Sequence, residues 1–202
     1  MSLLTEQQFD TLKEVVNIGV GRAASSLNEM LDAHIELQVP SIYFFRLGET
    51  EKIPDHLKTQ SLACVQMGFQ GTFSGTAALV FPPDSAAKLV TALTGESAGA
   101  PGMNAVMAGT LNEVGNILLN GVMGTIGNIL SKPFDYSFPN YLEGALTELL
   151  NAPGDGDSTG VLMVQTNFRV EELEIEGNVF LLFETKTFTT LIQELDALMH
   201  ET

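Results

Sequence analysis

Two stretches of equal length decide how this chain folds: EVVNIGVGRAASSLNEMLDAHIELQVP at residues 14–40 and EVGNILLNGVMGTIGNILSKPFDYSFP at residues 113–139. Each begins with Glu, has Asn three positions later, and ends with Pro 23 positions after that Asn. All three residues recur at a constant offset of 99 positions: Glu14, Asn17 and Pro40 in the first stretch, and Glu113, Asn116 and Pro139 in the second. A single Glu-x-x-Asn is common and is weak evidence of a site. Its recurrence with the same spacing to a proline indicates an ancestral unit that was duplicated together with a polar site.

The duplication extends beyond the motif. Val65, Gln66 and Phe69 recur at the same offset of 99, and after them the offset becomes 102. The matching residues are then Gly75, Phe81, Leu89 and Leu93 against Gly177, Phe183, Leu191 and Leu195. A three-residue insertion in the second hairpin explains the change, because loops accept insertions readily. We therefore expect a single domain over residues 1–202, built of two repeats at about 1–98 and 99–202.

The apolar periodicity and the turn residues place helices and strands along the chain. Thr5 and Gln8 have the form of a capping box that begins a long helix to about Asp32, with an apolar stripe that runs from Phe9 to Met30. The other predicted helices lie at about 83–93, 104–130, 141–150 and 188–199. The predicted strands lie at 35–46, 62–71, 75–81, 161–170 and 179–184, with a further short strand after the helix that ends near residue 130. The expected class is α+β: two duplicated α/β halves related by pseudo-twofold symmetry, with the long motif-bearing helices packed on an antiparallel sheet.

Composition and charge narrow the classes of partner. The net charge is −16 and 45% of the residues are hydrophobic, so a large core is expected, and nucleic acid and anionic membranes are poor partners. The N-terminus has no basic segment followed by an apolar run. The uncharged stretch Val114–Ser131 carries Gly and Asn, which favours a buried helix over a membrane span. We expect a soluble cytoplasmic protein without membrane insertion, in which Cys64, the single cysteine, is a buried thiol.

The two motifs are predicted to form polar helix faces. At about 100° per residue, Asp10, Glu14 and Asn17 lie opposite the apolar stripe of the first long helix. On the second long helix, the residues opposite the apolar stripe are Glu113, Asn116 and Asn120. Small residues flank both faces and would let a partner approach closely: Gly21 and Ala24 in the first copy, and Gly109 and Gly124 in the second. An ordinary solvated face is the alternative, but Asn is a mediocre helix former and its paired recurrence disfavours that interpretation.

One carboxylate and one amide suit only a few kinds of chemistry. They are too few to hold a metal ion. An amide both donates and accepts hydrogen bonds and can orient a water molecule, and a carboxylate can bind a lysine or arginine of a partner. This pair fits the hydrolysis of a phosphoryl group carried on another protein, where positioning supplies most of the acceleration. Pro40 and Pro139 are interpreted as structural, because each fixes the backbone after its helix.

At these residues the chain resembles the CheC/CheX/FliY family of chemotaxis phosphatases. The family pattern is Asp or Ser, three residues, Glu, two residues, Asn, 22 residues and Pro. The first copy matches it in full, including Asp10, whereas the second copy has Gly109 in place of the Asp or Ser. The length and the two copies most resemble the CheC branch, and the resemblance covers essentially the whole chain.

The resemblance implies a function. The protein would hydrolyse the aspartyl phosphate of a CheY-like receiver domain, with Asn17 and Asn116 orienting the attacking water and Glu14 and Glu113 pairing with the receiver's lysine. Asp10 would assist docking. Mg²⁺ would belong to the receiver, so this chain would need no cofactor of its own, and the deamidase CheD is a further possible partner. Two alternatives stay open: a non-enzymatic adaptor of the same fold that binds a receiver, CheD or the flagellar switch, and a small-ligand binder between the two halves.

Overall fold

A computed structural model describes residues 4–46, 61–96, 103–145, 160–184 and 188–201. Its four helices in these ranges are α1 (Glu6–Leu31), α3 (Pro83–Thr94), α4 (Met103–Ile129) and α6 (Phe188–Glu201). The strands are β1 (Ile35–Leu37), β2 (Ser41–Arg46), β3 (Leu62–Gly71), β4 (Gly75–Phe81), β5 (Phe134–Tyr136), β6 (Asn140–Gly144), β7 (Gly160–Val170) and β8 (Ile175–Glu184). A 3₁₀ turn, Glu171–Leu173, lies between β7 and β8.

Local chemistry explains where two of the helices begin and end. The predicted capping box of α1 is present, because the Gln8 N–H donates to Thr5 Oγ1 at 3.2 Å and the Thr5 N–H donates to Gln8 Oε1 at 2.9 Å. Helix α3 has a proline in its first turn and ends at Gly95, whose φ of 73° suits a residue without a side chain. The signals read from the sequence at these ends are confirmed.

Three details of the prediction are corrected. The helix expected at 141–150 is wrong over 141–144, where β6 pairs with β3, and residues 146–150 lie outside the described ranges. The single strand expected over 35–46 is two strands that are separated at residues 38–40. Met30 does not join the buried stripe of α1 and is 37% exposed, because it lies in the last turn of the helix.

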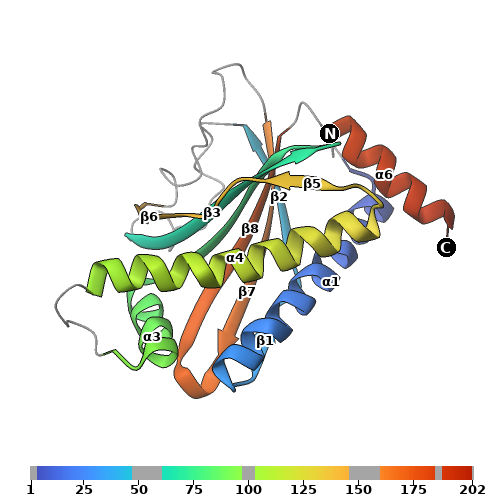
Figure 1. Ribbon diagram of the computed structural model, residues 1–202. Coiled ribbons are helices and arrows are strands. Elements are labelled where there is room, and N and C mark those ends of the chain that lie inside the picture. The colour runs from blue at the N-terminus through green and yellow to red at the C-terminus, as the bar shows by residue number, and fades with distance from the viewer. Residues whose placement is uncertain (1–3, 47–60, 97–102, 146–159, 185–187, 202) are drawn as a thin grey trace.

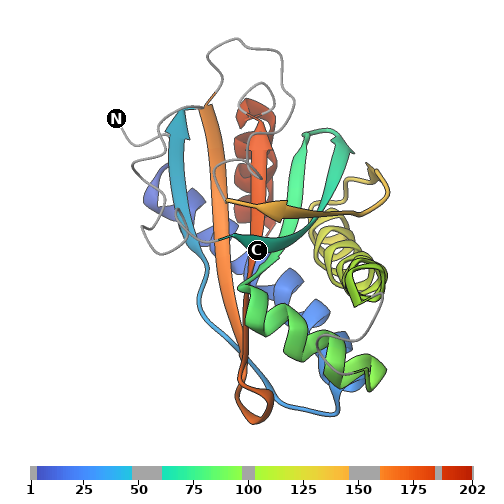
Figure 2. The same ribbon diagram turned by 90° about the vertical axis from the view of Figure 1, so that its left-hand side faces the viewer.

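The strands form one antiparallel eight-stranded sheet. Its order is β1-β7-β8-β4-β3-β5, with β2 also pairing with β7 and β6 also pairing with β3. Helices α1 and α4 cross on one face of this sheet and pack against each other, as Figure 1 shows. Helix α3 packs on α4 and α6 packs on α1, and all four helices contribute side chains to the main core. In Figure 2 strands of the sheet lie in front of α1 and α6. The fold is α+β, as predicted.

The two halves repeat each other in register. The pair Ile35↔Val170 between β1 and β7 corresponds, at the offset of 99, to the pair Phe134↔Gly71 between β5 and β3. The pair Ser41↔Gln165 corresponds in the same way to Asn140↔Gln66. Each half therefore gives its first two strands to the hairpin of the other half, and the central β4–β8 pairing joins the two hairpins.

The main core lies between the sheet and the helices. It contains residues of both halves, including an aromatic cluster of Phe69, Phe73, Phe134 and Phe183 whose rings meet edge to face or tilted at centroid distances of 4.8–5.9 Å. A smaller apolar cluster around Cys64, Val80, Met163 and Phe180 occupies the opposite face of the sheet. Within the described residues no helix combines the length and the apolar character that a membrane span requires.

Candidate functional site on two helix faces

The first motif lies on the outer face of α1. Asp10, Glu14 and Asn17 are all exposed, whereas Val15 and Val16 between them are buried in the core. None of the three polar side chains forms a hydrogen bond or ion pair with any residue that the structure describes. The predicted exposure of this copy is confirmed, and its carboxylates and amide are available to a partner.

The second motif lies on the outer face of α4 and differs in one contact. Glu113 is exposed, but Asn116 is half-buried, and its Oδ1 accepts a hydrogen bond from Asn120 Nδ2 at 2.7 Å. The residue of α1 that is equivalent to Asn120 is Gly21, which has no side chain, so Asn17 lacks such a partner. Sequence reasoning placed Asn120 on this face but missed the bond, although the spacing of four residues on a helix was a signal for it.

Small residues leave both faces flat. A Cβ built at Gly21, Gly109 or Gly124 would have no neighbouring atom within 4 Å, so these positions open to solvent. Because no side chain projects there, another protein surface could approach the backbone of either helix closely. This agrees with the flat surface that the sequence predicted beside each Glu and Asn.

Buried small residues hold the two helices in place. A Cβ at Gly115 would come within 2.4 Å of Val65 Cγ1, so α4 rests directly on β3 at the level of the motif. A Cβ at Gly19 would meet the carbonyl oxygen of Val122 at 3.1 Å, which brings α1 against α4. The two polar faces are thus fixed to the sheet and to each other from their inner sides.

The motif prolines lie at equivalent corners, just before β2 and β6. The Gln38 N–H donates to the Asn167 carbonyl at 3.0 Å, and its counterpart, the Ser137 N–H, donates to the Gly68 carbonyl at 2.9 Å. Pro40 is buried and Pro139 is half-buried. The residue before each proline is apolar and exposed, Val39 at 73% and Phe138 at 94%, and this paired exposure was missed from the sequence.

The described residues offer little other chemistry. Among them no group of three or more His, Cys, Asp or Glu side chains could hold a metal ion. Cys64 is fully buried, and burial raises the pKa of its thiol to about 12, so it is a packing residue, as expected.

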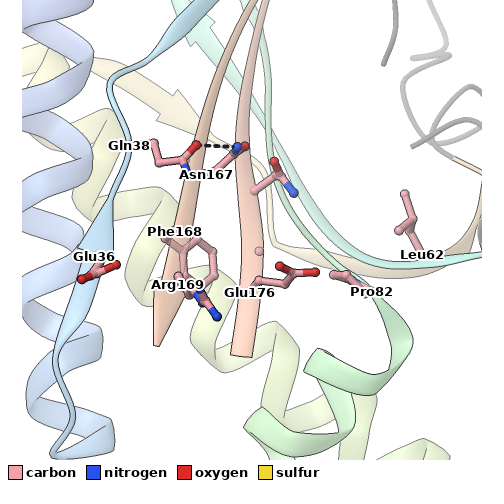
Figure 3. Close-up of a pocket in the computed structure, with 10 residues that line it drawn as sticks. Glu36, Gln38, Leu62, Pro82, Asn167, Phe168, Arg169 and Glu176 are labelled. Atoms are coloured by element: carbon pink, nitrogen blue, oxygen red, sulfur yellow. Dashed lines mark hydrogen bonds between the residues drawn. The ribbon is translucent and has the colours of Figure 1, made fainter. Parts of the chain in front are cut away.

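A pocket of about 420 Å³ lies away from both motifs. It is lined by polar side chains of β7 and β8 and by Glu36 and Gln38, and Figure 3 shows Asn167 Nδ2 donating to Gln38 Oε1, a bond of 2.9 Å. Asn167 and Arg169 alternate along β7 with Phe168, which packs in the main core, so they point to the sheet face opposite the helices. None of the motif residues lines this pocket.

Comparisons with known proteins match two separate parts of the chain to two family models. A family model described as "Chemotaxis phosphatase CheX" matches residues 63–159, and a model described as "CheC-like family" matches residues 8–43. The first match contains Glu113, Asn116 and Pro139, and the second contains the whole first motif from Asp10 to Pro40.

Whole-chain similarity agrees with these matches. The chain is 24% identical to the CheY-P phosphatase CheC of Bacillus subtilis, and the alignment covers 96% of each protein. Its fold is similar to that of Thermotoga maritima FliY, with a TM-score of 0.75 at 16% identity over 96% of this chain and 98% of the other. It is also similar to a chain in the CheX-CheY-BeF3-Mg+2 complex of Borrelia burgdorferi, with a TM-score of 0.56 at 20% identity over 82% and 96% of the two chains.

Each copy of the Glu-x-x-Asn…Pro motif therefore falls inside one of two family matches, and one curated relative aligns with almost the entire chain. Along almost its whole length the chain is similar to members of the CheC/CheX/FliY family of chemotaxis phosphatases.

Proposed function

We propose that this protein hydrolyses the aspartyl phosphate of a CheY-like receiver domain. One observation carries the proposal: an exposed Glu and an Asn three residues later stand on the outer face of a helix twice, once inside the match to the CheC-like family and once inside the match to the chemotaxis phosphatase CheX. The name of the Bacillus subtilis relative, a CheY-P phosphatase, supports the choice of substrate.

The roles follow from the chemistry of the two side chains. In this proposal the amide of Asn17 or Asn116 orients a water molecule in line with the phosphorus, because an amide can donate and accept hydrogen bonds at once. Water attacks the phosphorus, the bond from phosphorus to the aspartate oxygen breaks, and inorganic phosphate leaves. Glu14 or Glu113 pairs with a lysine of the receiver and holds the amide at the phosphoryl group.

The metal belongs to the substrate in this proposal. The receiver carries the Mg²⁺ that neutralises charge on the phosphoryl group, and this chain supplies no cofactor. The Borrelia burgdorferi complex, which contains CheX and CheY, supports a receiver as the partner in this reaction.

The two copies differ in docking. Asp10 adds a third polar side chain, exposed one turn before Glu14, whereas Gly109 supplies none at the equivalent position of α4. We infer that both sites act and that the first binds the receiver more tightly. CheD is proposed as a second partner on the family resemblance alone.

An assay with far less of this protein than of receiver tests the proposal against the adaptor alternative, because only an enzyme can act on many receiver molecules in turn. A CheY-type receiver from the source organism is phosphorylated with a small-molecule donor, the donor is removed, and the decay of the phosphate is followed with one part of this protein to twenty of receiver. Complete and accelerated decay is expected from an enzyme. Binding of the receiver without faster decay would contradict the proposal and favour the adaptor.

A further inference from the structure

The two motif copies are not chemically equal, and Asn120 makes the difference. Its Nδ2 donates to Oδ1 of Asn116 at 2.7 Å, one helical turn away. The counterpart of Asn120 on α1 is Gly21, and Asn17 has no hydrogen-bond partner among the described residues. One proposed water-orienting amide is therefore held by a neighbour, and the other is not.

A hydrogen bond of this kind fixes which end of the amide faces outward. The last torsion of an asparagine side chain is broad and roughly two-fold, so an unrestrained amide presents either its oxygen or its NH₂ group. When Asn120 donates to Oδ1, the Asn116 oxygen turns toward the C-terminal side of α4, and its NH₂ group keeps both donors free. The oxygen also retains a second lone pair, so the bond leaves Asn116 able to contact a water molecule.

We propose that Asn120 is a positioning residue that holds Asn116 with its NH₂ group directed at the incoming phosphoryl group and water. This inference rests on the proposed function and deepens it, because it names what prepares the second site. A side chain that is already oriented avoids an ordering cost that the unrestrained site meets only as the transition state forms, so the difference falls on kcat and not on KM. In this proposal Asn120 acts through Asn116 and has no direct role in the reaction.

The inference gives the two sites different strengths. The first site has Asp10 for docking and an amide at Asn17 without a hydrogen-bond partner among the described residues, and the second has no docking residue at Gly109 but a hydrogen-bonded amide at Asn116. Taken one at a time, the first site should show the lower KM and the second site the higher kcat. A purely structural role for Asn120 predicts no such division.

Each site can be measured alone in a background that removes the other asparagine. In the Asn17→Ala background only the second site acts, and there Asn120→Ala is expected to lower kcat by about three- to tenfold with KM unchanged. Asn120→Asp can only accept, so it turns the Asn116 amide around, and it is expected to lower kcat further than Asn120→Ala. Unchanged kcat in both variants, or a change confined to KM, would overturn the inference.

The reciprocal change keeps the test independent of any folding defect at Asn120. In the Asn116→Ala background only the first site acts, and Gly21→Asn places an amide where a Cβ meets no atom within 4 Å. We expect kcat to rise by about three- to tenfold. Gly21→Ala is the matched control, since it adds the same Cβ to the docking face without the amide, and the rise in kcat for Gly21→Asn is measured relative to it. Equal kcat for the two variants would overturn the inference.

A readout without catalysis completes the experiment. The side-chain NH₂ resonances of Asn116 are expected to show a higher order parameter than those of Asn17, and Asn120→Ala should remove that difference. Equal mobility in the wild-type protein would overturn the inference while leaving the proposed function intact. A wild-type protein that does not accelerate receiver decay would overturn the proposed function, and the inference with it.

Discussion

At the scale of single residues, each motif places some side chains where a partner can reach them and adjacent side chains in the core. Glu14 and Asn17 face solvent, whereas Val15 and Val16 are buried between them. Because the exposed pair has no partner within the described residues, replacing either side chain should leave stability within about 0.5 kcal/mol of the wild type. Loss of activity in such variants would therefore report on chemistry and not on folding.

The glutamates should act through their charge. We expect Glu14→Gln combined with Glu113→Gln to lower kcat/KM for receiver decay by about tenfold or more, because a hydrogen bond to a charged group becomes a weaker neutral one. The measurement is receiver decay at several salt concentrations, and the salt dependence should be shallower in the variant.

Glu29→Gln is the matched control for this prediction. Glu29 is exposed on the same helix, three turns beyond the motif, so Glu29→Gln removes the same single charge as Glu14→Gln alone, but away from the site. An equal loss of activity from the control would mean that overall charge matters and not these two positions.

The sequence predicted that all four motif side chains are exposed, which holds for Glu14, Asn17 and Glu113, whereas Asn116 is half-buried. Helical periodicity suffices to place Glu14 and Asn17 on the face opposite the core. The bond between Asn120 and Asn116 depends on side-chain torsions that periodicity does not encode, and the exposure of Met30 depends on where the neighbouring elements end. The catalytic roles themselves stay a prediction that rests on the family resemblance.

At the scale of elements, glycines decide how closely α4 lies on the sheet. Gly115 stands where any Cβ would overlap Val65 of β3, and Gly124 stands on the same helix with open space around its Cβ position. The inner glycine is a requirement of packing, whereas the outer one costs helix stability without any internal contact.

Alanine at these two positions should shift stability in opposite directions. Gly115→Ala is expected to destabilise the fold by about 1–3 kcal/mol, because the new methyl group meets Val65 and has to push α4 away. Gly124→Ala is expected to stabilise it by about 0.5–1 kcal/mol through lower backbone entropy of the unfolded chain. Urea unfolding monitored by circular dichroism measures both, and equal effects would contradict the close approach of α4 to β3.

Sequence signals within a few residues predicted most of the helices and strands correctly. They failed where a strand forms only because it pairs with a segment far away in the chain. The capping box at Thr5 and the glycine stop at Gly95 are local, and both were found from the sequence. Residues 141–144 read as helical by themselves, but β6 forms because residues 140–144 pair with β3, some 75 positions earlier in the chain. The first repeat held a clue, since its equivalent residues, 42–45, read as a strand.

At the scale of the whole molecule, the repeats exchange strands. Strands β1 and β2 of the first half pair with β7 of the second, and β5 and β6 of the second pair with β3 of the first. The offset of 99 revealed the repetition but could not reveal this exchange, because a repeat in sequence does not state which copy a strand pairs with. The main core likewise draws on both halves.

Strand exchange predicts that neither half folds alone. Fragments 1–98 and 99–202 each lack the edge strands that the other supplies, so each should show no cooperative urea transition by itself. Mixed in equal amounts, they should recover the far-ultraviolet spectrum and one transition. A full chain cleaved between residues 98 and 99 after folding is the control, and cooperative unfolding of either isolated fragment would contradict the exchanged sheet.

The central claim is that Asn17 and Asn116 orient the attacking water, and one measurement tests it most directly. Decay of a phosphorylated CheY-type receiver is followed with the wild-type protein and with the Asn17→Ala, Asn116→Ala double variant, alongside binding of each to the beryllofluoride-activated receiver. The account predicts that the variant binds within about threefold of the wild type and loses on the order of 100-fold or more of the acceleration. A folded double variant that still accelerates decay as the wild type does would contradict it.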